Sequence, residues 1–374
     1  MRVAVVAEFY PRRADPVLGI WAHRQAIATR DEGVELVVFV LSRVVGRRNA
    51  ALRAAFHQPA LDVLDGLEVR YVRYISPPRG WTYARWGAWA APALRTAVRR
   101  AGRFDLVHAH NAVPAGDAVL RAGLGIPVVI SVHGGDVLWT VSQVPRGAAV
   151  VRRTFERARL VLANSAGIER LTREHGARET RVVHLGSDLP PRVARGTKPL
   201  IATVSHLVAR KRHADVLRAL VELAGVRYLV IGDGPEREPL ARLAVELAVA
   251  DRVEFTGQLD PEAALARSRE ASLFVLPSTE EAFGVAYIEA MAAGVPAIGC
   301  SGEPGPEEIA ASGGGIVLVP PRDPAALAAA IGGLLDDRAE LERLALAARA
   351  TIERSFSWAR CGAETLAAYE DALR

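Results

Sequence analysis

The sequence contains very little cysteine, methionine or lysine. Its 374 residues include two cysteines, two methionines and two lysines, against 45 arginines. Cys300 and Cys361 form neither a CxxC motif nor a zinc-ligand spacing, so a disulfide framework is not expected and a reducing compartment is favoured. No apolar run reaches the ~18–20 residues of a membrane-spanning helix, and acidic Glu8 ends the first one too early for a signal peptide. We therefore expect a cytoplasmic protein.

Common cofactor and nucleophile motifs are also absent. The sequence has no DxD pair, no His/Cys/Asp cluster with metal-ligand spacing, no P-loop and no GxSxG elbow. The first apolar run leads into Glu8-Phe9-Tyr10-Pro11 instead of a GxGxxG fingerprint, and the only nearby glycine is Gly19. These absences argue against a nicotinamide enzyme, and we expect neither a metal ion nor a cofactor.

Charge of either sign is unevenly spread along the chain. Residues 1–185 carry 27 basic and 15 acidic side chains, a formal charge of +12, whereas residues 186–374 carry 20 and 27, a formal charge of −7. A basic half predicts an anionic partner, either an acidic membrane surface, an anionic acceptor or nucleic acid. No nucleic-acid-binding motif supports nucleic acid as the partner. The alternative is arginine enrichment that reflects genome composition.

Short apolar runs alternate with longer helical patterns along almost the whole chain. Several of the runs are continuous Val/Ile/Leu, which is typical of parallel strands buried on both faces. We expect strands at Val3–Ala7, Val34–Leu41, Leu67–Ile75, Leu106–His110, Pro127–His133, Leu160–Asn164, Arg181–Leu185, Leu200–Ser205, Tyr228–Gly232, Arg252–Gly257, Ser272–Leu276, Pro296–Gly299 and Ile316–Val319. Helices are expected between them, as at His23–Asp31, Arg212–Ala224, Glu236–Ala248 and Ala325–Leu335.

This alternation predicts an α/β protein with two Rossmann-like, doubly wound parallel-sheet domains that face a cleft. The strand series restarts after Ser187–Pro199, which is rich in proline, glycine and charge, as linkers are. The expected divisions are an acceptor-side domain at 1–185, a linker at 186–198, a donor domain at 199–355, and a last helix at 356–374 that packs back toward the first domain.

One segment of the first half combines aromatic and basic residues. Residues 74–92 read YISPPRGWTYARWGAWAAP and include Trp81 and Trp86. Tryptophan and arginine together favour a membrane interface or an acceptor groove. The alternative is that these aromatic side chains only pack on their own domain.

Candidate binding residues follow the expected strands, where open α/β sheets bind ligands. Arg210 and Lys211 precede a helix, and cations beside a helix start can hold a diphosphate. Glu281 lies in a loop, Phe283-Gly284 opens the next helix, and Glu289 follows eight residues after Glu281 in an apolar setting. Two such carboxylates can accept hydrogen bonds from sugar hydroxyls or from a ribose diol.

A third candidate group follows the strand expected at Pro127–His133. It consists of His133, two glycines and Asp136, so polar side chains and free backbone can approach a ligand there. A structural role for the histidine is the alternative.

Four stretches of the second half, VSHLVARKRHADVLRAL, VIGDGPE, VEFTG and LPSTEEAFGVAYIEAMAAGVPAIG, closely resemble the retaining family 4 glycosyltransferases, which have the two-domain GT-B fold. In the first half, PVLGIWAHRQAIATRDEG, DLVHAH, ISVHGGDVLW and LVLANS resemble members that build bacterial cell-surface polysaccharides. The resemblance covers nearly the whole chain and is least informative over Arg43–Arg100.

The resemblance implies metal-independent transfer of a sugar from a nucleotide-diphosphate sugar to a glycan or lipid-linked glycan, at the inner face of the membrane. In such an enzyme Arg210 and Lys211 would neutralise the diphosphate, Glu281 would bind the donor sugar, and Glu289 would bind the ribose. The remaining implied positions are donor-binding amides around Phe283, Gly284 and Val285, His133 near the reaction centre, Gly19 near phosphate or acceptor, and an acceptor side that includes Asp136, Trp81 and Trp86.

Three departures from the family pattern leave the acceptor side less defined than the donor side. Leu18 stands before Gly19, Ala282 replaces a common glycine, and residues 185–188 read Leu-Gly-Ser-Asp. The alternatives are another GT-B enzyme, an epimerase or a phosphorylase, and a non-catalytic nucleotide-binding partner subunit. A non-catalytic subunit with a decayed site would be expected to lack one of the four charged residues. All four are present: Arg210, Lys211, Glu281 and Glu289.

Overall fold

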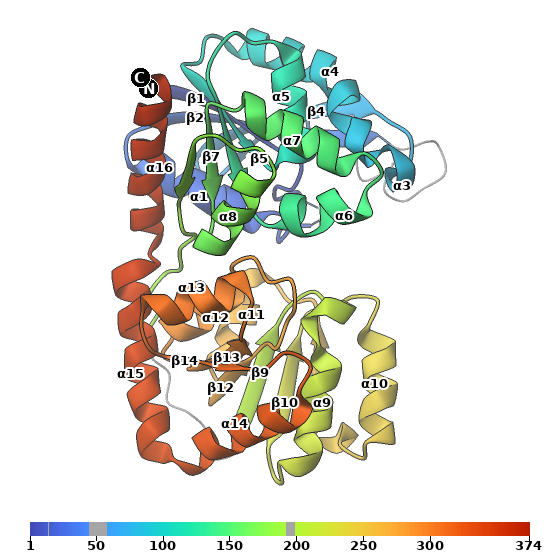
Figure 1. The fold of residues 1–374 in the computed structure, drawn as a ribbon, viewed down its shortest axis with the longest axis vertical. Helices are drawn as coiled ribbons and strands as arrows, with labels where there is room; N and C mark the ends of the chain where they lie inside the picture. The colour runs from blue at the N-terminus through green and yellow to red at the C-terminus, as the bar shows by residue number, and fades with distance from the viewer. Residues whose placement is uncertain (14, 45–57, 192–198) are drawn as a thin grey trace. The chain divides into compact units, whose positions relative to one another are not determined.

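The structure, a computed structural model, describes residues 1–13, 15–44, 58–191 and 199–374. The chain divides into two compact α/β units, each built on one sheet (Figure 1). Unit 1 comprises Met1–Leu185 and Trp358–Arg374, and unit 2 comprises Gly186–Ser357. Of the expected linker at 186–198, residues 192–198 lie outside the described residues.

Unit 1 contains an eight-stranded sheet with the order β3-β4-β2-β1-β5-β6-β7-β8. All neighbouring strands are parallel except β3, which runs antiparallel to β4. The central strands are buried along their length because helices cover both faces of the sheet. The strands are β1 (Arg2–Ala7), β2 (Glu35–Val44), β3 (Leu61–Leu64), β4 (Leu67–Ile75), β5 (Leu106–His110), β6 (Val128–Val132), β7 (Leu160–Ala163) and β8 (Thr180–Val182).

The last helix of the chain completes the core of unit 1. Helix α16 (Trp358–Leu373) packs beside α1 (Ile20–Asp31) and contributes Cys361 and Tyr369 to the core. The other helical elements are α3 (Arg79–Thr82), η1 (Tyr83–Arg85), α4 (Trp86–Ala101), η2 (Ala112–Gly116), α5 (Asp117–Ala122), η3 (Gly135–Thr140), α6 (Val141–Gln143), α7 (Gly147–Arg157) and α8 (Ala166–Glu174).

Unit 2 contains a six-stranded, fully parallel sheet with the order β11-β10-β9-β12-β13-β14. Chain order reverses between β9 and β12, which is the switch point of a doubly wound sheet. The strands are β9 (Leu200–Val204), β10 (Arg227–Ile231), β11 (Val253–Gly257), β12 (Leu273–Val275), β13 (Ala297–Cys300) and β14 (Ile316–Val319).

Local sequence signals account for several helix starts in unit 2. The side chains of Asp260, Asp323 and Asp337 each accept a hydrogen bond from a first-turn amide, as N-cap residues do. The helical elements are η4 (Ala209–Lys211), α9 (His213–Glu222), α10 (Arg237–Glu246), η5 (Ala250–Arg252), α11 (Pro261–Ser268), α12 (Val285–Ala292), α13 (Pro304–Ser312), α14 (Pro324–Asp336) and α15 (Arg338–Ser355).

The prediction of two parallel-sheet α/β domains is confirmed, and each expected strand is present within a few residues of its predicted bounds. Strand β3 was missed. It joins β4 through Asp65-Gly66, whose φ angles of 48° and 80° suit a two-residue hairpin turn. Its apolar side chains Leu61 and Val63 are 55% and 65% exposed, so β3 lacks the buried run that marks the other strands.

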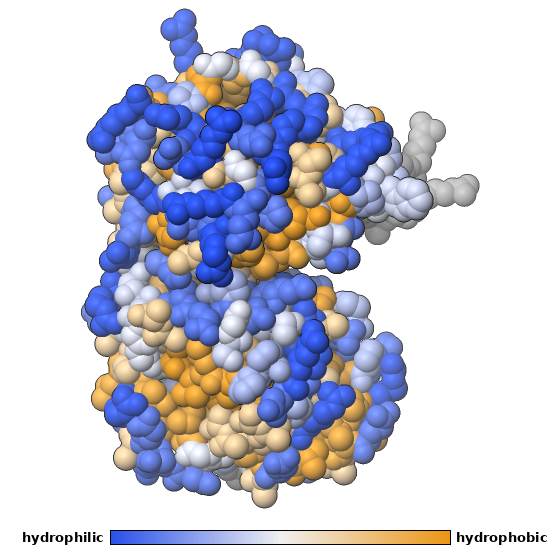
Figure 2. Space-filling model, viewed as in Figure 1, coloured by the Kyte–Doolittle hydropathy of each residue, from blue (hydrophilic) through white to orange (hydrophobic). Residues whose placement is uncertain are grey.

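Figure 2 shows strongly hydrophilic residues spread over one face of unit 1 and apolar residues gathered between α14 and α15 on unit 2. Within the described ranges, no helix is both long enough and apolar enough to cross a bilayer.

Candidate functional site

The switch point of unit 2 brings together the two charged segments that the sequence indicated. The segment after β9 forms η4, which contains Arg210 and Lys211, and the segment after β12 leads through Glu281 into α12. Both segments lie at the carboxyl ends of adjacent parallel strands. This edge is where open α/β sheets bind ligands.

Lys211 and Glu281 form a largely buried ion pair. The Lys211 Nζ donates to Oε2 of Glu281 at 2.5 Å, and the Ser278 hydroxyl donates to the same oxygen at 2.8 Å. The two charged side chains are only 12% and 10% exposed. Burial alone would raise the pKa of Glu281, but Lys211 and Ser278 stabilise the carboxylate and hold that pKa below its usual value. Glu281 is therefore an ionised hydrogen-bond acceptor.

Arg210 ties the two segments together through its backbone and remains exposed at its side chain. Its carbonyl oxygen accepts the amide of Thr279 at 2.8 Å, and its guanidinium donates to the Glu280 carbonyl at 3.4 Å. An exposed arginine with one long contact keeps most of its donors available for an anion. A second cation thus lies at the same loop as the Lys211–Glu281 pair.

Glu303 belongs to this group, although it was not among the residues predicted from the sequence. It precedes α13, and its Oε2 accepts the backbone N–H of Glu281 at 2.8 Å. Burial and the nearby Glu281 carboxylate raise the pKa of Glu303, while the backbone amides of Glu281 and Glu280 oppose the shift. Glu303 therefore positions the Glu281 loop. Its only sequence signal was a carboxylate at the end of an apolar strand.

The start of α12 presents backbone rather than the Phe283 ring. Phe283 is 2% exposed and packs against Phe356, with 5.6 Å between ring centroids. Gly284 has φ of 82°, and a Cβ there would lie 2.4 Å from the Tyr287 ring, so glycine is required. Val285 begins the helix, and Glu289 is half-buried about one turn along it. The sequence predicted a role for the amides of residues 283–285, and binding of the donor by these amides stays a prediction.

A buried network of polar side chains lies next to η4, at the start of α9. His213 lies between the Ser205 hydroxyl at Nε2 and the Tyr228 hydroxyl at Nδ1, both at 2.8 Å, and Thr203 extends the chain of hydrogen bonds. Burial, followed by the charge of Lys211, lowers the pKa of His213 to about 3. This neutral histidine fixes the start of α9, directly after Arg210 and Lys211 in the sequence.

In unit 1, His133 belongs to a cluster of three histidines at the ends of β5 and β6. His133 Nε2 and His110 Nδ1 share a hydrogen bond of 2.9 Å, and their rings are stacked. His108 lies 4.5 Å from His110 between centroids and is held by Tyr369 and Ser131, each at 2.7 Å. His110 and His108 were expected only as strand residues. Their spacing, His-Ala-His, places both side chains on one face of β5.

Burial keeps these three imidazoles neutral. It lowers the pKa of His108 to about 3 and that of His133 to about 4, and the pKa of His110 also falls well below its usual value. Nδ1 of His133 is buried and has no hydrogen-bond partner among the described residues. Trp21, near the start of α1, lies 6.0 Å from the His133 ring. His133 can accept or donate a hydrogen bond but cannot supply charge near neutral pH.

Asp136 supports a neighbouring loop. It is 2% exposed, and its two carboxylate oxygens accept the amides of Ala112 at 2.7 Å and Val113 at 3.2 Å. Burial raises its pKa to about 7 despite these two hydrogen bonds. The side chain that was expected on the acceptor side thus already has backbone partners.

Gly19 is fixed by a close approach within unit 1. It has φ of 66° and precedes α1, and a Cβ there would lie 2.2 Å from the carbonyl carbon of Phe9. Glycine is therefore needed for packing of the loop that follows β1. Contact of Gly19 with a phosphate or an acceptor remains a prediction.

The two tryptophans assigned to the acceptor side have opposite environments. Trp86 is 3% exposed and packs against Tyr74, Tyr83 and the guanidinium of Arg43. Trp81 is 88% exposed. The packing alternative therefore applies to Trp86, and only Trp81 is accessible to a ligand or a surface.

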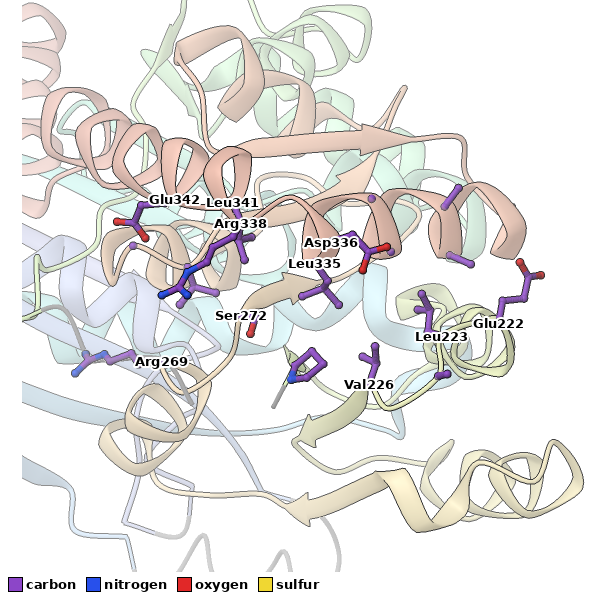
Figure 3. A pocket seen from close by; sticks show the side chains of 18 of the residues that line it. Glu222, Leu223, Val226, Arg269, Ser272, Leu335, Asp336, Arg338, Leu341 and Glu342 are labelled. Atoms are coloured by element: carbon purple, nitrogen blue, oxygen red, sulfur yellow. The ribbon is translucent and has the colours of Figure 1, made fainter. Parts of the chain in front are cut away.

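Unit 2 has a large cavity of about 1210 Å³ (Figure 3). Its lining includes Pro199, Val226, Ser272 and Val295, which precede β9, β10, β12 and β13. It therefore lies at the amino ends of the strands, away from Lys211 and Glu281. Across the described part of the chain, no three His, Cys, Asp or Glu side chains are grouped to hold a metal ion.

Two family models match the chain and together span most of it. Residues 18–189 match the model described as Glycosyltransferase Family 4, and residues 188–351 match the model described as Glycosyl transferases group 1. A D-inositol 3-phosphate glycosyltransferase from Mycobacterium ulcerans is 30% identical over 100% of this chain and 86% of its own length.

Solved structures agree with the fold. The sucrose-phosphate synthase from Thermosynechococcus elongatus gives a TM-score of 0.81 at 21% identity, covering 99% of this chain and 98% of its own. The Anabaena protein HepE in complex with UDP and glucose gives 0.75 at 20% identity, covering 99% of both chains. The chain therefore belongs to the family 4 glycosyltransferases and has their GT-B fold.

Proposed function

We propose that this glycosyltransferase moves a sugar from a nucleotide-diphosphate donor to a hydroxyl of a glycan or lipid-linked glycan in cell-surface polysaccharide synthesis. The observation that carries the proposal is the Lys211–Glu281 pair at the carboxyl ends of β9 and β12, with Arg210 beside it. Two cations and an ionised carboxylate lie together at the ligand-binding edge of the sheet.

The cations stabilise the leaving group. As the bond between sugar and diphosphate breaks, negative charge grows on the phosphate oxygens, and Arg210 and Lys211 neutralise it. Amides at Phe283, Gly284 and Val285 supply further donors at the start of α12. These fixed charges perform the task without a metal ion. The complex of HepE with UDP and glucose supports a nucleoside diphosphate as the leaving group.

The carboxylates orient the donor. Glu281, held ionised by Lys211 and positioned by Glu303, accepts hydrogen bonds from sugar hydroxyls, and Glu289 accepts those of the ribose. We expect His133 to offer the sugar a neutral hydrogen-bonding imidazole, because burial lowers its pKa to about 4. The acceptor attacks from the side of the leaving group, so the configuration is retained, and the departing phosphate takes the acceptor proton. No enzyme nucleophile is assigned.

A thermal-shift screen tests this proposal. The protein is heated with UDP, GDP, ADP and their common sugar conjugates, and at 100-fold above the dissociation constant a ligand adds about 2.7 kcal/mol of stability. We expect one base to raise the melting temperature, and Lys211→Ala to abolish the shift. No shift with any nucleotide contradicts the donor site.

Product analysis then separates the alternatives. Transfer of the donor sugar to an added acceptor supports the proposal, whereas epimerised donor or phosphorolysis indicates another GT-B enzyme. A bound nucleotide without turnover on any acceptor indicates a non-catalytic partner subunit.

A further inference from the structure

Unit 1 has a shallow hollow of about 540 Å³ that is separate from the histidine cluster. It is bordered by α3, η1, α5, α7 and the segment that leads into α7. Four arginines and an exposed tryptophan dominate its lining, which comprises Trp81, Thr82, Ala84, Arg85, Arg121, Pro145, Arg146, Val150 and Arg153. No acidic or amide side chain is among these residues.

Two of the four arginines are held in place by one buried carboxylate. Asp117 is 2% exposed and binds Arg121 at 2.8 Å and Arg153 at 2.7 Å. Each guanidinium has five N–H donors, so both keep donors free for a second anion. Arg85 and Arg146 are exposed and form no ion pair among the described residues. The four positive charges therefore exceed the single negative charge of Asp117.

Trp81 adds an amphipathic side chain to this basic surface. It is 88% exposed and lies on α3, whose Thr82 hydroxyl donates to the Pro78 carbonyl at 2.6 Å. A largely exposed indole is unfavourable in water and favourable at the headgroup level of a bilayer, where its ring is buried and its N–H remains hydrated.

We propose that this hollow docks the protein on an anionic phospholipid bilayer, with Trp81 among the headgroups and the arginines on lipid phosphates. Charge complementarity selects this partner, because guanidinium groups match phosphate oxygens. A neutral glycan would instead be recognised by carboxylate and amide side chains, which the lining lacks. Docking places a lipid-linked substrate near the enzyme, but it does not depend on the transfer reaction.

The test compares two charge-reversed variants in vesicle co-sedimentation. Arg85→Glu with Arg146→Glu reverses two charges in the hollow, and Arg99→Glu with Arg100→Glu reverses two exposed charges on α4 as a matched control. We expect the wild-type protein to bind phosphatidylglycerol vesicles but not phosphatidylcholine vesicles. Because each arginine near the surface contributes about fivefold, the first variant should bind at least about 25-fold more weakly and the control less than about fivefold.

Tryptophan fluorescence supplies a second readout. Phosphatidylglycerol vesicles should shift the emission of the wild-type protein to shorter wavelength, and Trp81→Phe should remove most of this shift. Equal loss of binding in both charge variants, equal binding to both lipids, or binding of soluble glycerol 1-phosphate without binding to vesicles would overturn the proposal. The nucleotide-induced thermal shift, measured on each variant, reports folding and donor binding separately from lipid binding.

Discussion

The two units carry different electrostatics at the same structural position. At the carboxyl edge of its sheet, unit 2 has cations and carboxylates joined by the Lys211–Glu281 pair. At the corresponding edge, unit 1 has the neutral pair His110 and His133. A charged cluster suits a diphosphate, and a pair of neutral imidazoles suits hydroxyl groups. The same fold thus provides two edges with different chemistry.

Net charge alone would have placed the diphosphate-binding cluster in the first half of the chain instead of the second. Residues 1–185 have a formal charge of +12 and residues 186–374 one of −7, yet Arg210 and Lys211 lie in the acidic half. Local geometry decides, because a cation held at a strand end acts on a nearby phosphate much more strongly than exposed charges that salt screens. The excess of arginine in the first half instead contributes to the hollow beside Trp81.

The largest expected effect comes from breaking the ion pair. Lys211→Ala or Glu281→Ala should lower the rate of sugar transfer by about 10²-fold or more, because a fixed contact to the transition state is lost. Each change also leaves a buried charge unpaired, at a cost of about 3–5 kcal/mol. Steady-state transfer assays and denaturant unfolding measure the two effects, with exposed Arg242→Ala on α10 as the control.

A double variant separates activity from stability. Lys211→Met with Glu281→Gln removes both charges and should recover most of the lost stability while remaining inactive. Recovery of near-normal transfer in this variant, or near-normal transfer in both single variants, would contradict the assigned roles.

A smaller effect is expected from the residue that positions Glu281. Glu303→Ala removes the acceptor of the Glu281 amide and should lower kcat/KM for the donor by about tenfold, whereas Glu303→Gln keeps an acceptor oxygen and should cost less than about threefold. Glu307→Ala is the matched control, since Glu307 lies in the first turn of α13, which begins directly after Glu303, and its side chain accepts the exposed Gly302 amide. Equal losses for Ala and Gln at position 303 would show that its charge matters instead.

The last effect, which is the smallest near neutral pH, is the pH dependence of the histidine cluster. The folded-state pKa of His133 is lowered to about 4, whereas an unfolded histidine has a pKa of about 6.5. The unfolded state therefore binds the proton first, and unfolding free energy falls as pH drops from about 6.5 to 4, by up to about 1.4 kcal/mol per pH unit for each such histidine. His133→Asn should reduce this slope.

NMR provides the direct measurement for the same residues. The ring signals of His108, His110 and His133 should stay constant between pH 8 and pH 5. A His133 signal that titrates near pH 6.5 would show that the histidine pair carries charge and would remove the contrast between it and the Lys211–Glu281 pair.

Much of the fold and the donor side could be predicted from local patterns. Buried Val/Ile/Leu runs marked the parallel strands, and the charged residues after β9 and β12 marked the edge where they meet. The hairpin strand β3 was missed because its apolar side chains face solvent, although Asp65-Gly66 carried a turn signal. Glu303 was missed because its partner is a backbone amide 22 residues away in sequence.

The sequence by itself determined the family, the order of helices and strands along the chain, and the charged donor motif, since these depend on periodicity and residue type. Tertiary structure decided which similar residues differ in role: Trp81 is exposed and Trp86 buried, and Asp136 binds backbone while Glu281 binds Lys211. The physical reason is burial, which depends on contacts between segments distant in sequence and sets whether a polar or aromatic group can meet a ligand.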